Sequence, residues 1–487
     1  MERKLIFDKD RGCRNSSYIT PSLDIKPEEI FGGDMLREDL SLPDISESEV
    51  VRHYMQLARL NFSVDTNFYP LGSCTMKYNP KINEYLSGLE GFSRIHPLQR
   101  EDDLQGALEL MYEFQNLLCA LTGMKAFAFQ PSSGAQGELT GILMVRSFHE
   151  INGSKKSKVI VPDSAHGTNP ATATMCGYET VVIESRDGLV DIHQLEKSFD
   201  EDVAALMLTN PNTLGLFEKD ILKISRIVHE RGGLLYYDGA NFNPLMGIAK
   251  PALMGFDIIH LNLHKTFSTP HGCGGPGAGI VGAVEPLEEF LPLPRIKKRN
   301  KTFYLDYGSE KSLGSPRTFF GNFDVLVKAY AYILRLGREG LKRAAQNSVL
   351  NANYIKKKLE KYYQPAYSKQ CMHEVVFSCS EQKKRGASAL DIAKRLIDYR
   401  IHPPTMYFPL IVKEALMVEP TETENKEMLD YFIRAMIKID EDTEKNPQKL
   451  KSSPHKAAVG RVDETRAARM PVLAHTGCGK HKKSQKT

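Results

Sequence analysis

From about residue 100 to residue 285, the sequence alternates between short apolar stretches typical of β-strands and longer stretches with helical periodicity. This alternation predicts a largely parallel sheet whose two faces are covered by helices. We expect helices between most of the strands, for example over residues 137–150 and 217–231. The expected strands cover residues 126–130, 158–161, 180–184, 204–209, 233–238, 257–262 and 278–283. Because ligands of such sheets bind at the carboxyl ends of the strands, functional side chains are expected there.

A lysine follows the expected strand at residues 257–262. Lys265 comes after an apolar, β-branched run and before a glycine-rich stretch from Gly272 to Gly279. A lysine amine at the edge of a buried sheet, if partly desolvated, can be neutral at physiological pH and form a Schiff base with a carbonyl cofactor. A surface lysine after a strand is the ordinary alternative. The residues at the other strand ends decide between the two interpretations.

An anion-binding turn is expected after the strand at residues 126–130. Ser132, Ser133 and Gly134 stand there, at the start of an expected helix. Hydroxyl groups, a flexible backbone and a helix N-terminus together form a cradle suited to a phosphate. A helix N-cap would explain one serine but not the whole group.

Three further strand ends carry polar residues. Asp238 closes an apolar strand, where a carboxylate is costly unless it is paired with a cation such as a protonated pyridine nitrogen. His166 could stack on a flat ring, and Asn210 could donate a hydrogen bond to a ring oxygen, although turn chemistry would explain both. A phosphate cradle, an imidazole, a polar turn, an aspartate and a lysine together predict bound pyridoxal 5'-phosphate.

A polar loop bounded by prolines precedes this region. It contains Cys74, Thr75 and Lys77, and loops of this composition often line functional sites. A plain surface turn is the alternative.

The rest of the chain predicts a second, smaller domain. We expect an N-terminal arm over residues 1–70, a large cofactor-binding domain over 71–320, a small α+β domain over 321–440 and a basic, disordered tail over 441–487. The arm contains an amphipathic helix at 47–60. In the small domain we expect helices at 322–359, 389–399 and 426–439, and strands at 374–378 and 416–418. Disorder is expected at least from Ser452.

The composition excludes several classes of protein. A net charge of +4 is too small to indicate nucleic-acid binding, and no apolar run is long enough to cross a bilayer. The charged N-terminus lacks the features of a signal peptide. The eight cysteines include no CxxC pair, which favours free thiols in the cytoplasm over disulfides or a zinc site. We therefore expect a cytoplasmic protein with no bound metal.

Several segments closely resemble the glycine cleavage system P-protein family, in its two-chain bacterial form. The likeness runs from about residue 20 to residue 440 and is carried by specific motifs. These motifs are YPLGSCTMKYNP at 69–80, SGAQGE at 133–138, AHGTNPA at 165–171, DGAN at 238–241 and LHKTF at 263–267. The resemblance implies a fold-type I pyridoxal-phosphate enzyme, with a mostly parallel large domain, that decarboxylates glycine and transfers the aminomethyl group to the lipoyl arm of the H-protein.

The resemblance also implies roles for individual residues. Lys265 would bond to the cofactor aldehyde, Asp238 would pair with the pyridine nitrogen, and His166 would stack on the ring. The phosphate would be bound by Ser132, Ser133 and Gly134, helped by His264. The loop residues Cys74 and Thr75 would line the site, and Lys77 would contact the substrate carboxylate. The expected partners are subunit 1 of the P-protein and the lipoylated H-protein, acting with the T- and L-proteins.

Two alternatives remain open. The chain could be another pyridoxal enzyme of the same fold, such as a desulfurase or an aldolase, although no cysteine stands out as a desulfurase nucleophile. It could also be a subunit that only supports its partner. Intact Lys265 and Asp238 argue against that second alternative.

Overall fold

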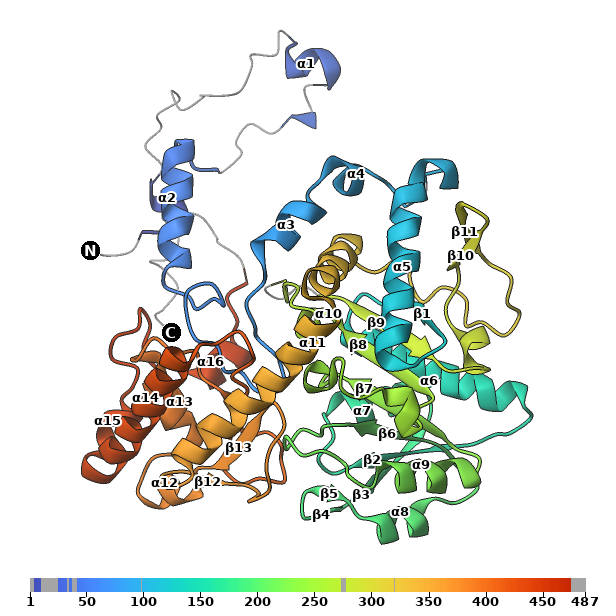
Figure 1. Ribbon diagram of the computed structural model, residues 1–487. Coiled ribbons are helices and arrows are strands. Elements are labelled where there is room, and N and C mark those ends of the chain that lie inside the picture. Colours follow the sequence, from blue (N-terminus) through green and yellow to red (C-terminus); the bar gives the residue numbers. More distant parts are fainter. Residues whose placement is uncertain are drawn as a thin grey trace. The chain divides into compact units, whose positions relative to one another are not determined.

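The computed structural model describes residues 4–9, 25–32, 35–36, 42–97, 99–272, 277–318 and 320–473 (Figure 1). The chain divides into two compact units. The larger unit, Ser63–Pro454, contains every residue expected in the cofactor site. The smaller unit combines Met1–Phe62 with His455–Thr487.

The centre of the larger unit is a mixed sheet with the strand order β1-β9-β8-β7-β6-β2-β3. Strands β3, β2, β6, β7 and β8 run parallel to one another, whereas β9 runs antiparallel to both β8 and β1. The strands are β1 Ala126–Ala128, β2 Lys158–Pro162, β3 Glu179–Ile183, β6 Val203–Thr209, β7 Leu234–Gly239, β8 Ile258–Asn262 and β9 Gly279–Ala283. The predicted, mostly parallel α/β fold is therefore confirmed.

Helices cover both faces of this sheet, as the continuous apolar strands require. Every residue of β6 is buried, and its successive side chains enter opposite cores. Leu206 shares one core with Val228 of α9, whereas Met207 shares the other with Val145 of α6. The helices of this region are α5 Gln105–Thr122, α6 Gly134–Ile151, α7 Thr168–Met175, α8 Ile192–Ser198, α9 Ile221–Glu230 and the short α10 Leu263–Thr266.

Helix α11 (Phe323–Leu359) leads from the large sheet into a smaller α+β lobe (Figure 1). Its backbone leaves helical geometry at Gly337, where φ is 59° and ψ is −174°, so two helical segments meet there. The lobe is built on an antiparallel sheet with the order β12-β13-β15-β14. Its elements are β12 Gln364–Pro365, β13 Val375–Ser378, β14 Thr405–Met406, β15 Ala415–Val418, α12 Ser380–Lys384, α13 Ala389–Ile397, α14 Lys426–Lys445 and α15 Pro447–Lys451. The predicted strands and helices are present, while the exact domain boundaries stay predictions.

Short elements complete the described chain. In the larger unit they are α3 Lys81–Ser87, α4 Glu90–Ser93, β4 Ser185–Arg186, β5 Leu189–Val190, β10 Arg295–Arg299, β11 Thr302–Asp306 and the 3₁₀ helices Glu101–Leu104, Asn243–Leu245, Pro251–Met254 and Leu287–Phe290. In the smaller unit they are a 3₁₀ helix at Ile6–Lys9, α1 Pro27–Ile30, α2 Glu47–Ala58 and α16 Glu464–Arg469. Helix α2 is the predicted amphipathic helix, and Ser46 and Glu49 form a capping box at its start.

The prediction of a disordered tail over residues 441–487 is wrong for residues 441–451, most of which lie in helices. Helix α14 continues to Lys445, and α15 follows with Leu450 fully buried in the core of the small lobe. The polar composition of this stretch hid that single apolar anchor. Between Ser452 and residue 473, the described residues contain one short helix, α16, whose side chains are exposed. Residues 474–487 lie outside the described residues.

Two further predictions concern the whole chain. Across the described ranges, none of the helices has both the length and the apolar character needed to span a bilayer. The described cysteines, Cys74, Cys119, Cys176, Cys371 and Cys379, are free thiols. The other cysteines, Cys13, Cys273 and Cys478, lie outside the described residues.

Candidate active site

A cavity of about 250 Å³ lies at the carboxyl edge of the large sheet. Most of the residues expected to bind the cofactor line it, although they come from distant parts of the sequence. These are Ser133, Gly134, His166, Asp238, His264 and Lys265. The strand ends therefore converge on one site, as expected for a sheet of this kind.

Lys265 lies on the short helix α10, directly after β8. Its side chain is partly buried, and its Nζ donates a hydrogen bond to the backbone carbonyl of Ser73 at 2.9 Å. Ser73 also lines the cavity. The polar loop that contains Cys74, Thr75 and Lys77 therefore does reach the site, through the backbone of Ser73.

Asp238 is the penultimate residue of β7 and is 3% exposed. Its carboxylate accepts hydrogen bonds from the backbone N–H of Ala240 at 3.0 Å and from Asn169 Nδ2 at 3.2 Å. Burial opposes ionisation, but the nearby His260 ring, the Ala240 N–H and Lys265 together hold the pKa of Asp238 below its ordinary value. Asp238 is thus kept as a carboxylate that can pair with a cationic ring nitrogen.

His260 supports this carboxylate from the neighbouring strand. Its Nε2 lies 3.4 Å from Asp238 Oδ1, and its Nδ1 lies 2.6 Å from the hydroxyl of the buried Tyr236. With Tyr236 donating to Nδ1, the ring carries its proton on Nε2, which lies 3.2 Å from Asn262 Oδ1 and also faces Asp238. Burial lowers the pKa of His260, although the charge of Asp238 opposes this shift. A histidine within an otherwise apolar strand was the sequence signal that could have identified it.

The expected phosphate cradle forms the start of α6. Ser133 is the N-cap, and its Oγ accepts a hydrogen bond from the Gln136 N–H at 3.1 Å. A Cβ at Gly134 would lie 1.9 Å from Asn262 Nδ2, so only glycine fits at this position. Ser132 is turned toward Gln136 Oε1 by two hydrogen bonds, at 2.6 Å and 2.8 Å, and does not line the cavity.

Gly134→Ala is expected to raise the dissociation constant for pyridoxal 5'-phosphate at least about tenfold, because the new methyl group displaces Asn262 into the cradle. Titration of the cofactor-free chain, followed by absorbance, measures this change. Gly106→Ala on α5 is the matched control, since nothing lies within 4 Å of its added Cβ. Equal cofactor affinity in both variants would contradict the assignment of the cradle.

The two histidines expected near the cofactor both line the cavity. His166 is exposed, its Nδ1 accepts the Thr168 N–H at 3.2 Å, and its ring meets Phe408 edge to face at 5.5 Å. His264 contacts the backbone of Ala278 through Nδ1, at 3.1 Å from the carbonyl oxygen. Burial and the nearby His271 and Lys265 lower the pKa of His264 to about 3, so in the absence of a bound anion its ring is neutral at physiological pH.

Asn210 does not line the cavity. It is fully buried, and its Oδ1 accepts the backbone N–H of Glu218 at 3.0 Å. Its neighbour Thr209 faces the cavity instead, and the Thr209 Oγ1 has no hydrogen-bond partner within the part of the chain that the structure describes. The predicted polar turn reaches the cavity through Thr213, and Thr209 directly before the turn also lines it, whereas Asn210 itself does not.

Glu218 gives the folded chain a testable pH dependence. Burial raises the pKa of its carboxyl to about 7, although the Val190 N–H and Asn212 hydrogen bonds oppose this. Since the folded state binds this proton more tightly than the unfolded state, stability falls as pH rises from about 4.5 to about 7. Glu218→Gln removes this slope, which spans on the order of 3 kcal/mol.

Urea titrations of the wild type and Glu218→Gln at pH 5 and pH 8 measure the difference. The exposed Glu427→Gln on α14 is the control, and it should change the free energy of unfolding equally at both pH values. The prediction fails if Glu218→Gln behaves in the same way.

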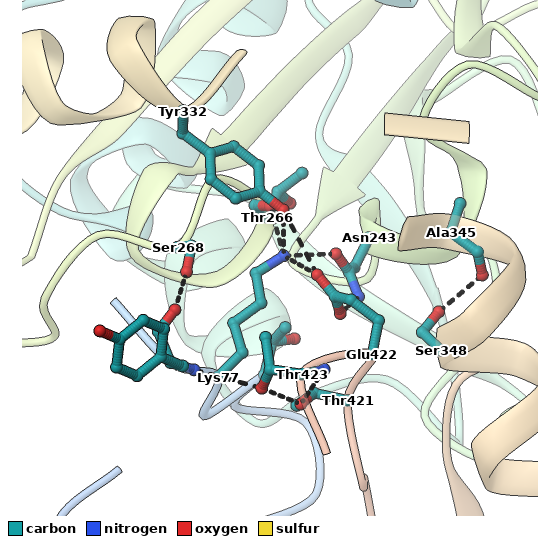
Figure 2. A network of polar contacts seen from close by, with 12 residues as sticks. Lys77, Asn243, Thr266, Ser268, Tyr332, Ala345, Ser348, Thr421, Glu422 and Thr423 are labelled. Atoms are coloured by element: carbon teal, nitrogen blue, oxygen red, sulfur yellow. Dashed lines mark hydrogen bonds and ion pairs between the residues drawn. The ribbon is translucent and has the colours of Figure 1, made fainter. Parts of the chain in front are cut away.

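The three candidate substrate residues of the polar loop do not line the cavity. The N–H and Oγ of Thr75 bind Glu419 at 2.8 Å and 2.6 Å. Cys74 is partly buried, and burial raises the pKa of its thiol to about 11, which makes it a poor nucleophile at neutral pH. Lys77 is 2% exposed and lies in a separate polar network (Figure 2).

The assignment of Lys77 to the substrate carboxylate is therefore wrong. Its Nζ already has four partners within the protein: Asn243 Oδ1 at 2.8 Å, the Thr266 carbonyl at 2.8 Å, the Tyr332 hydroxyl at 3.2 Å and Glu422 Oε1 at 2.7 Å (Figure 2). No donor is left for a ligand. The sequence could not indicate these partners because they come from distant segments.

Glu138 is a site residue that the sequence reasoning missed. It lines the cavity, and its carboxyl accepts hydrogen bonds from Thr168 Oγ1 and Asn169 Nδ2, both at 3.0 Å. Burial and the charge of Asp238 raise its pKa to about 7. Its position in the SGAQGE motif was the available signal, but no role followed from the motif alone.

The donor set of the cavity fits pyridoxal 5'-phosphate. An amine, a buried carboxylate and an imidazole match the aldehyde, the ring nitrogen and the ring face of that cofactor. The glycine-only position at 134 gives the backbone close access to a phosphate, and the unpartnered Thr209 hydroxyl offers a further contact. The fold and the donor set together indicate this cofactor.

Comparisons of the sequence with known proteins agree with this reading. A family model described as "Glycine cleavage system P-protein" matches residues 27–295, and one described as "Glycine dehydrogenase, C-terminal domain" matches residues 344–458. A protein of Caldanaerobacter subterraneus subsp. tengcongensis is 54% identical, over 97% of this chain and 98% of its own length. One of Pseudothermotoga lettingae is 56% identical, over 97% and 99%. Both are named probable glycine dehydrogenase (decarboxylating) subunit 2.

Solved structures share the fold at low sequence identity. An inhibitor-bound glycine decarboxylase (P-protein) of the glycine cleavage system matches with a TM-score of 0.71 and 20% identity, over 85% of this chain and 94% of that one. A cysteine desulfurase from Thermococcus onnurineus matches with a TM-score of 0.60 and 15% identity, over 77% and 95%. The architecture is therefore shared with enzymes of different chemistry, so the site residues carry the functional argument.

Proposed function

The chain belongs to the glycine cleavage system P-protein family, and on this premise we propose that it is subunit 2 of a two-chain glycine dehydrogenase (decarboxylating). Its reaction is the decarboxylation of glycine, with transfer of the aminomethyl group to the lipoyl arm of an H-protein. The observation that carries the proposal is the meeting of Lys265 and Asp238 in one cavity, beside a cradle that admits only glycine at position 134.

Five of the cavity residues have a defined task in this proposal. Pyridoxal 5'-phosphate, when bound, supplies the electron sink for the electron pair left as carbon dioxide departs. Lys265 holds the cofactor covalently, and Asp238 pairs with its protonated ring nitrogen. Ser133 and Gly134 bind the phosphate, and His166 covers one face of the ring. The protein thus fixes the orientation of the reacting bond and supplies the charges around it.

The proposed partners follow from the same family. Relatives named as subunit 2 imply a partner subunit 1 within the glycine cleavage system. We propose that this chain pairs with subunit 1, and that the lipoylated H-protein receives the aminomethyl group before the T- and L-proteins act.

Isotope exchange tests this function directly. The chain is co-expressed with a candidate subunit 1 and mixed with lipoylated H-protein, glycine and labelled bicarbonate. Label should enter the carboxyl group of glycine only when both subunits and the H-protein are present. No exchange in the complete mixture, from a sample that has bound the cofactor, would refute the proposal.

The two alternatives predict different results. A desulfurase requires a reactive thiol, but burial raises the pKa of Cys74, the cysteine of the loop that reaches the site, to about 11. A supporting subunit would carry no covalent cofactor. Borohydride reduction and peptide mapping decide this point, since a pyridoxyl adduct on Lys265 excludes a purely supporting role.

A further inference from the structure

Two glutamates of the small lobe hold the loop that receives the Lys265 amine. Glu374 directly precedes β13 and Glu419 directly follows β15, and both are fully buried. Glu374 Oε2 accepts the Ser73 N–H at 2.7 Å. Glu419 accepts the N–H of Thr75 at 2.8 Å and its hydroxyl at 2.6 Å. These three short hydrogen bonds fasten the loop on both sides of Cys74.

The loop needs this fastening because its backbone is strained. Ser73 and Thr75 have φ values of +62° and +51°, in the left-handed region that side chains with a Cβ rarely occupy. Such conformations persist only where surrounding contacts determine them. Further anchors are the bridge between Leu71 and Val418 and the close approach of Gly72 to Met417, where a Cβ would lie 2.2 Å from Met417 Cγ.

One backbone carbonyl of the strained loop binds the reactive amine of Lys265. The Ser73 carbonyl, between the two anchored N–H groups, accepts the hydrogen bond from Lys265 Nζ at 2.9 Å. This carbonyl belongs to the peptide between Ser73 and Cys74, and the peptide on each side of it carries an N–H that a glutamate binds. Fixing both neighbouring peptides therefore limits the directions in which the carbonyl can turn. The two glutamates therefore act on Lys265 through the loop, although neither of them lines the cavity.

We propose that Glu374 and Glu419 are positioning residues of the active site, which hold the Ser73 carbonyl where it binds the Lys265 amine whenever that amine is not bonded to the cofactor. The inference rests on Lys265 as the cofactor lysine of the proposed function. Burial raises the pKa of Glu374 well above its ordinary value and that of Glu419 to about 7, so the inference depends on the hydrogen bonds to the loop and not on two buried charges.

The separations within the glutamate cluster are longer than those around a tetrahedral metal ion. His373 lies beside the two glutamates, and the three side chains bring one ligand atom each within 4.8 Å of one another. However, His373 Nε2 is 4.0 Å from Glu374 Oε1 and 3.8 Å from Glu419 Oε1. A tetrahedral ion with bonds of about 2.1 Å would bring its ligand atoms to roughly 3.4 Å. The glutamate oxygens lie at hydrogen-bond distance from Ser73 and Thr75 of the loop, and not from His373.

Amide hydrogen exchange of the cofactor-free chain tests the inference without requiring catalysis. In Glu374→Ala and Glu419→Ala, peptides covering residues 72–76 should exchange at least about tenfold faster than in the wild type, since the anchored N–H groups are released. The rate of covalent attachment of pyridoxal 5'-phosphate to Lys265, followed by borohydride reduction, should also differ between these variants and the wild type. Glu414→Ala, at the opposite end of β15, is the matched control, because Glu414 accepts the Ala389 N–H and does not touch the loop.

The outcomes separate the inference from its alternatives. Unchanged amide hydrogen exchange in both variants would show that the two glutamates do not hold the loop, which is the clamp proposed here. Faster amide exchange with an unchanged rate of cofactor attachment would show that the clamp does not act on Lys265.

If the alanine variants do not fold, Thr75→Val replaces them, because it removes only the hydroxyl bond to Glu419, and Thr75→Ser should restore wild-type behaviour. Zinc or EDTA should leave wild-type exchange unchanged, and a change would assign the cluster to a metal. Failure of the isotope exchange with intact attachment would refute the proposed reaction and leave the clamp standing.

Discussion

Replacing Lys265 by alanine is expected to abolish covalent attachment of the cofactor and to slow glycine decarboxylation by at least about 10³-fold, which corresponds to roughly 4 kcal/mol of activation free energy. The side chain is partly buried at the edge of the cavity, so its removal should leave the fold intact. Spectra of the purified chain after addition of pyridoxal 5'-phosphate, together with isotope exchange in the complete mixture, measure both effects.

Two control variants make this result specific. Lys265→Arg keeps a positive charge in the cavity but cannot form the covalent bond, so it should lose attachment as completely as the alanine variant. Lys81→Ala removes an exposed lysine on α3, which pairs with Asp65, and should behave as the wild type. A pyridoxyl adduct that persists in Lys265→Ala would show that another amine carries the cofactor.

The residues at the strand ends could be predicted because local sequence determines where a buried strand ends. Apolar runs define the strands, and the parallel arrangement brings their carboxyl ends to one edge. For this reason Ser133, Gly134, His166, Asp238 and Lys265 were assigned to one site from the sequence, and all of them line the cavity. Asn210 shows the limit of this reasoning, because a shift of one residue turns a side chain to the other face of the sheet.

Roles that depend on distant partners could not be predicted. Lys77 resembled a substrate ligand because a basic residue stood in a polar loop, but its partner Glu422 is 345 residues away in the sequence. Glu374 and Glu419 stood at the ends of small-lobe strands, and nothing local connected them to Ser73 or Thr75. The same holds for α15, which is ordered by the burial of Leu450 rather than by its own composition.

Lys77→Met is expected to destabilise the folded chain by about 3–5 kcal/mol, because it leaves the buried carboxylate of Glu422 without its cation. The lysine and glutamate side chains are 1% and 7% exposed, and their atoms lie 2.7 Å apart. Burial lowers the pKa of Lys77, although the Glu422 charge acts in the opposite direction. The Thr266 carbonyl, directly after Lys265, also loses a donor, so attachment of the cofactor should weaken as well.

The double variant Lys77→Met with Glu422→Gln distinguishes the charge effect from lost packing. If the unpaired carboxylate causes the instability, the second substitution should restore a large part of the lost free energy of unfolding, even though it adds another mutation to the core. Asn243 and Tyr332 can still bind the new amide, since both already contact Glu422, at 3.1 Å and 3.3 Å. Urea titration of the four proteins gives the coupling energy, and purely additive effects would mean that Lys77 acts through its aliphatic packing alone.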